Sequence, residues 1–183
     1  MNLYRVFGAG VILGLLLSLV LVGVDYYVPT KSVFIPGRPT ALVDPLYPPG
    51  RWAPPCASGQ DLIADPGYTD IVPLTGYKTI RVRVEYANPG AQKFALGFVA
   101  QAGLDLFPVE ALQGTFELSY EFDKLARKEG RVVLIFSAPD LKTVSSAAPI
   151  TIKKITVSYE DPVWHAAGFV KNISAYFRSF GSK

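Results

Sequence analysis

The sequence predicts a mainly β protein, an antiparallel β-sandwich with a transmembrane helix before it and an amphipathic helix after it. Three observations carry this prediction. Between residues 57 and 161 apolar side chains recur at every second position, which is the period of a strand with one buried face. Residues 6–24 contain no charged side chain. Beyond Pro162 the apolar period lengthens to that of a helix.

Residues 1–28 are predicted to form a membrane anchor. The run from Val6 to Val24 contains 19 residues, which as a helix span about 30 Å, the thickness of the hydrocarbon core of a bilayer. Asp25 and two tyrosines, suited to the membrane interface, follow the run. The alternative is a cleavable signal peptide, whose apolar region is usually about 7–15 residues long and ends at a small-residue cleavage site. The following DYYVPTK has no such site, so an anchor is preferred.

Three small residues in this run, Gly10, Gly14 and Ser18, repeat at a spacing of four and share one helix face. Small residues at this spacing let a second membrane helix approach closely, so they predict a helix-packing face. The alternative is that glycine and serine are simply frequent in membrane helices.

The topology is predicted from the rest of the chain, because the positive charges on the two sides of the anchor nearly balance. A β-rich domain after a signal-like anchor is typical of an exported domain. We therefore expect a single-pass membrane protein with a cytoplasmic N-terminus and the bulk of the chain periplasmic or extracellular.

Residues 29–56 are predicted to form a proline-rich extended stalk, because proline fixes φ and lacks an N–H donor. The prolines are Pro29, Pro36, Pro39, Pro45, Pro48, Pro49, Pro54 and Pro55. The stalk also carries apolar side chains that a solvated linker would not need: Val33, Phe34, Ile35, Leu42, Val43, Leu46, Tyr47 and Trp52. We expect it to lie along a surface, either of its own domain or of a neighbouring protein.

The sandwich is predicted over residues 57–161. Strands are expected over residues 61–64, 69–74, 80–86, 94–98, 116–122 and 132–136. The last of these, VVLIF, is uninterrupted and is typical of a strand covered on both faces. The segment from Asp123 to Gly130 starts with a helix-capping residue and ends with glycine, which favours a short helical turn.

The final strand is expected over residues 150–159, and its apolar side chains change parity half-way along. They are Ile150 and Ile152, followed by Ile155, Val157 and Tyr159. Strict alternation would turn one of these groups to water. An extra residue at Lys153–Lys154 restores a common face, so the sequence predicts a β-bulge there and a bent strand.

The order FELSYEF, DKLARKEG, VVLIF and ITIKKITVSYED resembles the second half of a jelly-roll domain of the carbohydrate-binding or galactose-binding-like type. In such domains a strand, a short helical turn, a buried strand and a long closing strand follow one another. The resemblance covers about residues 57–160 and implies a jelly-roll-like sandwich. It also implies sugar binding through exposed aromatic side chains and, in some members, a structural calcium ion, although no motif identifies those positions here.

Residues 162–183 are predicted to form an amphipathic C-terminal helix. One face carries the apolar side chains, which are led in by an aromatic residue: Trp164, Phe169, Val170, Ile173, Phe177 and Phe180. The other face is polar and basic. Such a helix can lie in the bilayer interface, or it can pack on the sandwich or on a partner protein, and both alternatives stay open.

The sequence does not predict an enzyme or a cofactor. The only histidine is His165 and the only cysteine is Cys56, which leaves no ordinary zinc site and no local sign of a histidine-based triad. Cys56 is expected to be inert, with an intermolecular disulfide as the alternative. Glu117 and Glu121 share one strand face. A glycosidase uses two carboxyl groups, but a solvated face is the preferred interpretation.

A metal site is not expected either, although QDLIADPGYTD holds weak candidates for calcium ligands in Asp61, Asp65 and Asp70. Calcium prefers oxygen ligands, yet this spacing fits no EF-hand loop. Two of the three aspartates resemble turn residues.

The composition argues against nucleic acid as a partner, because a net charge of +3 on 183 residues is too small and too scattered to bind it. Three functions remain. The preferred one is a non-catalytic accessory subunit that braces a larger membrane complex, for example a photosynthetic or respiratory one, on the extracytoplasmic face. It is preferred because the apolar side chains of the stalk and tail lie outside the predicted core, where other membrane subunits would bind. The alternatives are a membrane-tethered glycan- or ligand-binding module and a filament or surface-layer subunit.

Overall fold

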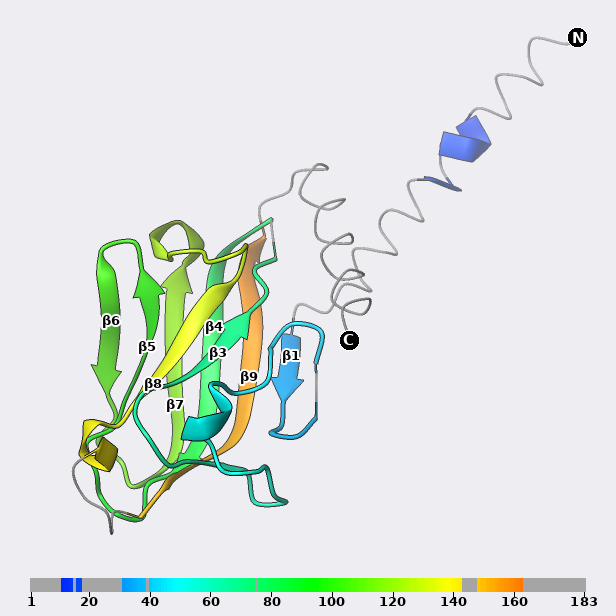
Figure 1. Ribbon diagram of the computed structural model, residues 1–183. Coiled ribbons are helices and arrows are strands. Elements are labelled where there is room, and N and C mark those ends of the chain that lie inside the picture. The colour runs from blue at the N-terminus through cyan, green and yellow to red at the C-terminus, as the bar shows by residue number, and fades with distance from the viewer. Residues whose placement is uncertain are drawn as a thin grey trace, which may run out of the picture.

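The computed structural model describes residues 11–14, 16–17, 31–38, 40–74, 76–142 and 148–162. These residues form two antiparallel sheets packed face to face (Figure 1). The first sheet has the order β1 (Lys31–Phe34), β9 (Ile150–Pro162), β4 (Tyr77–Ala87) and β7 (Gln113–Glu121), with β2 (Gln60–Leu62) also paired to β9. The second sheet has the order β3 (Gly67–Ile71), β8 (Val132–Ser137), β5 (Ala95–Ala100) and β6 (Gly103–Pro108).

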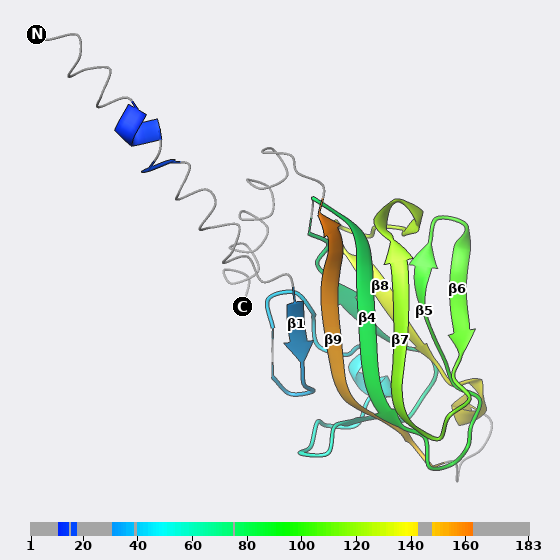
Figure 2. The ribbon, with the colours of Figure 1, turned by 180° about the vertical axis from the view of Figure 1, so that it is seen from behind.

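The predicted β-sandwich is confirmed, and its core lies between the two sheets. The alternating side chains of β4, Ile80, Val82 and Val84, are at most 1% exposed. All five residues Val132–Phe136 of β8 are buried, as an uninterrupted apolar strand predicts. Figure 2 shows β5 and β6 continuing beyond β7, so the edge of the second sheet projects past the edge of the first.

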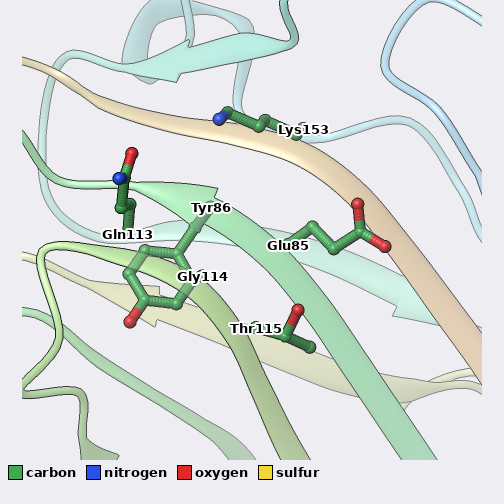
Figure 3. Close-up of a pocket in the computed structure, with 6 residues that line it drawn as sticks. All are labelled: Glu85, Tyr86, Gln113, Gly114, Thr115 and Lys153. Carbon is green, nitrogen blue, oxygen red and sulfur yellow. The ribbon is translucent and has the colours of Figure 1, made fainter.

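The β-bulge predicted in the last strand is present. Glu85 of β4 pairs with Lys154 and the next residue, Tyr86, pairs with Ile152, so Lys153 is the extra residue. Lys153 is exposed and projects from β9 in Figure 3. The bulge lets all the apolar side chains on both sides of it face the core: Ile150, Ile152, Ile155, Val157 and Tyr159.

The described proline-rich residues, 31–38 and 40–56, belong to the sandwich, so the boundary expected at residue 57 does not separate a stalk from a domain. β1 pairs with β9, residues 42–47 pair with the free edge of β3, and residues 51–53 pair with β2. Phe34, Leu42, Val43, Leu46 and Trp52 are buried in the core. Proline excludes a central strand but is tolerated at a sheet edge. The segment therefore covers edges that would otherwise be unpaired.

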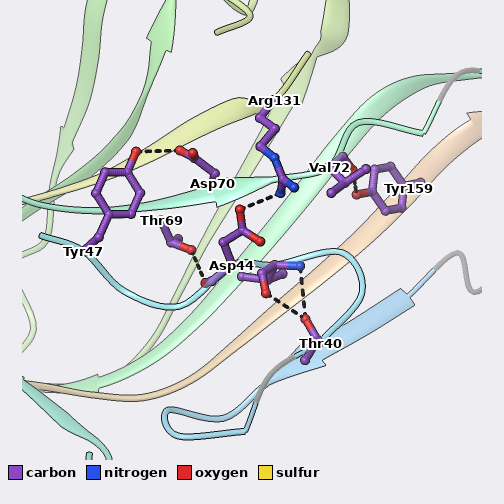
Figure 4. Close-up of polar contacts among 9 residues, drawn as sticks. Thr40, Asp44, Tyr47, Thr69, Asp70, Val72, Arg131 and Tyr159 are labelled. Carbon is purple, nitrogen blue, oxygen red and sulfur yellow. Dashed lines mark hydrogen bonds and ion pairs between the residues drawn. The ribbon is translucent and has the colours of Figure 1, made fainter. Parts of the chain in front are cut away.

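Polar contacts fix this segment against β3 (Figure 4). The Tyr47 hydroxyl donates to Asp70 at 2.6 Å, and the buried Thr69 hydroxyl donates to the Asp44 carbonyl oxygen at 2.7 Å. The Arg131 guanidinium lies 2.5 Å from the Asp44 carboxylate. These contacts join residues far apart in the sequence, which is why periodicity alone did not reveal them.

Two smaller differences concern local structure. β6 was not predicted, because its GLDLFP is short and ends in proline. The helical turn expected from Asp123 to Gly130 is shorter than expected, a 3-10 turn η2 (Phe122–Lys124), and Gly130 serves a second turn with a φ of 78°. Two further 3-10 turns are η1 (Pro49–Arg51) and η3 (Pro139–Lys142).

The structure describes only part of the predicted anchor, residues 11–14 and 16–17, which are helical and exposed. Within the described ranges, no helix is long and apolar enough to cross a membrane. Gly14 lies in this helical part, whereas Gly10 and Ser18 lie outside the described residues. The predicted C-terminal contact residues also lie outside them: Trp164, Phe169, Ile173, Phe177 and Phe180.

Candidate functional site

The outer face of the first sheet carries cross-strand ion pairs. Arg81 of β4 lies 3.1 Å from Glu117 of β7 and 2.8 Å from Glu160 of β9, so one guanidinium joins three strands. Further along the same face, Lys154 lies 2.7 Å from Glu85. Exposed pairs of this kind contribute at most about 1 kcal/mol each to stability. They do hold polar groups at fixed positions on an open surface.

At one end of this face lies a hollow of about 600 Å³, which we call the β6–β7 hollow. The edge of the second sheet projects beyond β7 at this place. Side chains of both sheets line the hollow. Its lining residues are Thr79, Arg81, Asp105, Phe107, Ser119, Tyr120, Glu121, Lys124, Glu160 and Asp161.

Two aromatic rings form one corner of the β6–β7 hollow. Phe107 of β6 pairs with the core residue Leu96 of β5, so its side chain is on the inner face of the second sheet. It is nevertheless 36% exposed, because β6 extends beyond β7. Its ring lies 6.3 Å from that of Tyr120 at an interplanar angle of 69°. The ring of Tyr120 also packs against the buried ring of Phe98, with the two centroids 5.4 Å apart. The corner is therefore a supported apolar surface open to solvent.

A glycine sets the position of this corner. Gly97 of β5 pairs with Leu106 of β6, and a Cβ atom at Gly97 would lie 1.8 Å from the carbonyl oxygen of Asp105. Any side chain there would push β6 away. The close approach of the two strands, and with it the place of Phe107, depends on this glycine.

The polar lining of the β6–β7 hollow is acidic, with four carboxylates against two cations, a net charge of −2. Lys124 pairs with Glu121 at 3.0 Å, and this hydrogen bond raises the pKa of Lys124. Asp161 accepts a hydrogen bond from Thr79 at 2.8 Å. Asp105 pairs with Phe98 of β5 through its backbone and contributes its carboxylate to the lining. The hollow thus combines an apolar corner with several hydrogen-bond donors and acceptors.

A second hollow of about 430 Å³ lies at the other end of the same face, next to the bulge (Figure 3). We call it the bulge hollow, and its lining residues are Glu85, Tyr86, Gln113, Gly114, Thr115 and Lys153. Its only aromatic residue, Tyr86, is 2% exposed and donates its hydroxyl to the Ala111 carbonyl. The bulge hollow therefore offers no exposed ring to a ligand.

The three aspartates considered as calcium ligands do not come together. Asp61 accepts from Thr151, Asp65 accepts from the Ala138 N–H, and Asp70 accepts from Tyr47. In the part of the chain that the structure describes, no group of three or more potential ligands is placed to hold a metal ion. The aspartates instead join separate segments of the sandwich.

The two glutamates of β7 lie on the outer face, as predicted, and each is paired with a cation. Glu117 contacts Arg81 and Glu121 contacts Lys124, with about half of each carboxylate side chain exposed. Cys56 is exposed and free, and a hydrogen bond with Ser58 lowers the pKa of its thiol. His165 lies outside the described residues.

The sequence does not predict the aromatic corner. Phe107 stands in the short strand that was not predicted, and Tyr120 was assigned to the core of its strand. Only the offset between the two sheets exposes them together. The one sequence signal for this corner is that Phe107, an apolar residue, stands beside a turn-rich segment.

No family model matches this chain, and no curated protein matches it. It is similar in fold to solved carbohydrate-binding modules. A family 29 module from Piromyces equi is 13% identical, with a TM-score of 0.41 over 70% of this chain and 89% of that one. A family 35 module from Clostridium thermocellum is 10% identical, with a TM-score of 0.39 over 69% and 97%.

A GH26-CBM35 β-(1,4)-mannanase from Podospora anserina is 9% identical, with a TM-score of 0.42 over 72% of this chain. The matched part spans only 28% of that enzyme. The resemblance to jelly-roll carbohydrate-binding domains that the sequence indicated is therefore found as a weak similarity of fold.

Proposed function

We propose that this protein is a membrane-anchored, non-catalytic binding module that holds a neutral glycan in the β6–β7 hollow. The observation that carries the proposal is the exposed ring pair of Phe107 and Tyr120 beside hydrogen-bonding side chains. The C–H groups on one side of a sugar ring fit the electron-rich face of an aromatic ring. The hydroxyl groups of the sugar can pair with the carboxylates, hydroxyls and cations around the corner.

The charge of the hollow defines the class of glycan. A net charge of −2 over the lining side chains repels uronate and sulfate groups and tolerates neutral or amine-bearing sugars. The bulge hollow is a poorer candidate, because its tyrosine is buried.

The accessory-subunit role loses part of its support. It was preferred because apolar side chains of the stalk, residues 29–56, and of the C-terminal tail would contact neighbouring proteins. Phe34, Leu42, Val43, Leu46 and Trp52 lie instead in the core of the protein's own sandwich. We retain the membrane anchor over residues 6–24 and the extracytoplasmic position of the sandwich as parts of the proposal, since both rest on the sequence pattern.

The full chain in detergent, applied to an array of neutral, amine-bearing, uronate and sulfated oligosaccharides, tests the proposal. We expect binding to neutral or amine-bearing members and at least about tenfold weaker binding by Phe107→Ala. Leu104→Ala is the matched control, because Leu104 lies on the opposite face of β6 and is 67% exposed. Equal binding by Phe107→Ala and the unchanged protein would contradict the proposal.

The anchor is tested separately by alkaline carbonate extraction of membranes that contain the full chain. An integral anchor keeps the protein in the membrane pellet, and its release to the supernatant would exclude a spanning helix.

A further inference from the structure

The β6–β7 hollow lies at the end of the sandwich where the chain enters it. Arg81, in the lining of the hollow, pairs with Ser158, and Ser158 also pairs with Lys31, the first residue of β1. Lys31 is therefore level with the hollow along the strands. Across the sheet, β1 and β7 are separated by three strand spacings, or about 14 Å.

The bulge hollow lies at the opposite end of the same sheet. Its lining residues Glu85 and Lys153 lie several residues further along β4 and β9 than the level of Ser158, where Lys31 pairs. The two ends of the outer face are therefore not equivalent with respect to the entry point of the chain. Only the aromatic, acidic hollow is beside it.

The predicted anchor ends a short way before this entry point. Seven residue steps separate Val24 from Lys31, and a fully extended chain of that length spans at most about 24 Å. This limit holds for any conformation of the connection. It keeps Lys31 within about 24 Å of the end of the predicted anchor, and β7 beside the hollow within about 38 Å of it.

The chain also leaves the sandwich at the end where the β6–β7 hollow lies. β9 ends at Pro162, which pairs with Tyr77 at the start of β4. The residues that follow are those whose sequence predicts an aromatic and basic amphipathic helix, a pattern typical of the bilayer interface. Both segments with a membrane-binding pattern thus join the sandwich at the same end of the strands as the hollow.

We propose that the ligand of the β6–β7 hollow is a neutral glycan carried by a lipid of the same membrane that holds the anchor. This inference rests on the proposed function of the hollow and on the predicted anchor. A short tether gives a glycan in the same membrane a high effective concentration at the hollow. A glycan that is free or on an opposing membrane has no such advantage.

The test uses the full chain reconstituted with its sandwich outward in phosphatidylcholine vesicles. The probe is a fluorescent soluble form of the neutral oligosaccharide that binds best on the array. The apparent Kd of the probe is measured in the presence of a lipid that carries the same oligosaccharide. In one arm this glycolipid is in the vesicles that hold the protein. In the other arm the same amount is in separate vesicles. Leu104→Ala serves as the folded control and Phe107→Ala as the variant without a site.

The inference predicts that glycolipid in the same vesicle raises the apparent Kd of the probe at least about tenfold. Glycolipid in separate vesicles should raise it less than about twofold. Equal effects of the two, or no effect of either while the probe still binds, would overturn the inference and leave the proposed function intact. Failure of the probe to bind the unchanged protein would instead remove the proposed function, and this inference with it.

Discussion

At the residue scale, one buried tyrosine joins the two sheets. Tyr159 of β9 donates its hydroxyl to the carbonyl oxygen of Val72, which follows β3 in the other sheet. Its ring stacks on Phe122 at 5.9 Å and 8° and lies 5.8 Å from Tyr77. Burial raises the pKa of Tyr159, so the neutral phenol is the form that the folded protein holds.

This predicts a loss of stability in alkali. An unfolded tyrosine ionises near pH 10, whereas folded Tyr159 keeps its proton, so the free energy of unfolding should fall above that pH by up to about 1.4 kcal/mol per pH unit. Tyr159→Phe should cost about 1–3 kcal/mol at pH 7, because the Val72 carbonyl loses the Tyr159 donor. The variant should also show a shallower alkaline decline. Urea unfolding from pH 7 to 11 measures both, and an unchanged alkaline slope would argue against this role for Tyr159.

At the element scale, a proline-rich segment closes the sandwich. Residues 31–56 pair with β9, β3 and β2 and contribute five large apolar side chains to the core. Each such side chain stabilises the fold by about 1.5–3 kcal/mol when fully buried. Their total is comparable to the whole stability of an ordinary domain, about 5–15 kcal/mol.

A fragment of residues 31–162 should therefore unfold cooperatively in urea, and a fragment of residues 57–162 should not fold. The shorter fragment lacks the partner of the β3 edge and exposes the face of Phe136 against which Trp52 packs. Far-ultraviolet circular dichroism and urea titration of the two fragments check this. A cooperative transition in the shorter one would restore the boundary at residue 57.

The bulge of β9 gives a second prediction at this scale. Deleting Lys153 removes the extra residue and places Ile150, Ile152, Ile155, Val157 and Tyr159 at strictly alternating positions, so all five can still face the core in a regular strand. We expect this deletion to change the free energy of unfolding by less than about 1 kcal/mol. Deleting Thr156 instead puts Ile155 out of step with Val157 and Tyr159, so at least one of these buried side chains must turn to water, at a cost of about 1.5–3 kcal/mol or more. Equal stabilities of the two deletion variants in urea unfolding would contradict this account of the bulge.

At the scale of the whole molecule, the sequence predicted the sheet elements better than their assembly. The period of two in β4 and β7 and the parity change in β9 are local signals, and the structure confirms them. The docking of residues 31–56 was not predicted, because prolines exclude a central strand without indicating which edge is covered. The β6–β7 hollow was not predicted either, since the offset of two sheets has no signature in either strand.

Nuclear magnetic resonance can show, residue by residue, whether the β6–β7 hollow is the ligand site. The labelled fragment of residues 31–162 would be titrated with the neutral oligosaccharide that binds best on the array. We predict amide shifts in Phe107, Ser119, Tyr120 and Glu121, with little change in Gln113 and Thr115 at the bulge hollow. Shifts confined to the bulge hollow, or no shifts at saturating oligosaccharide, would contradict the claim.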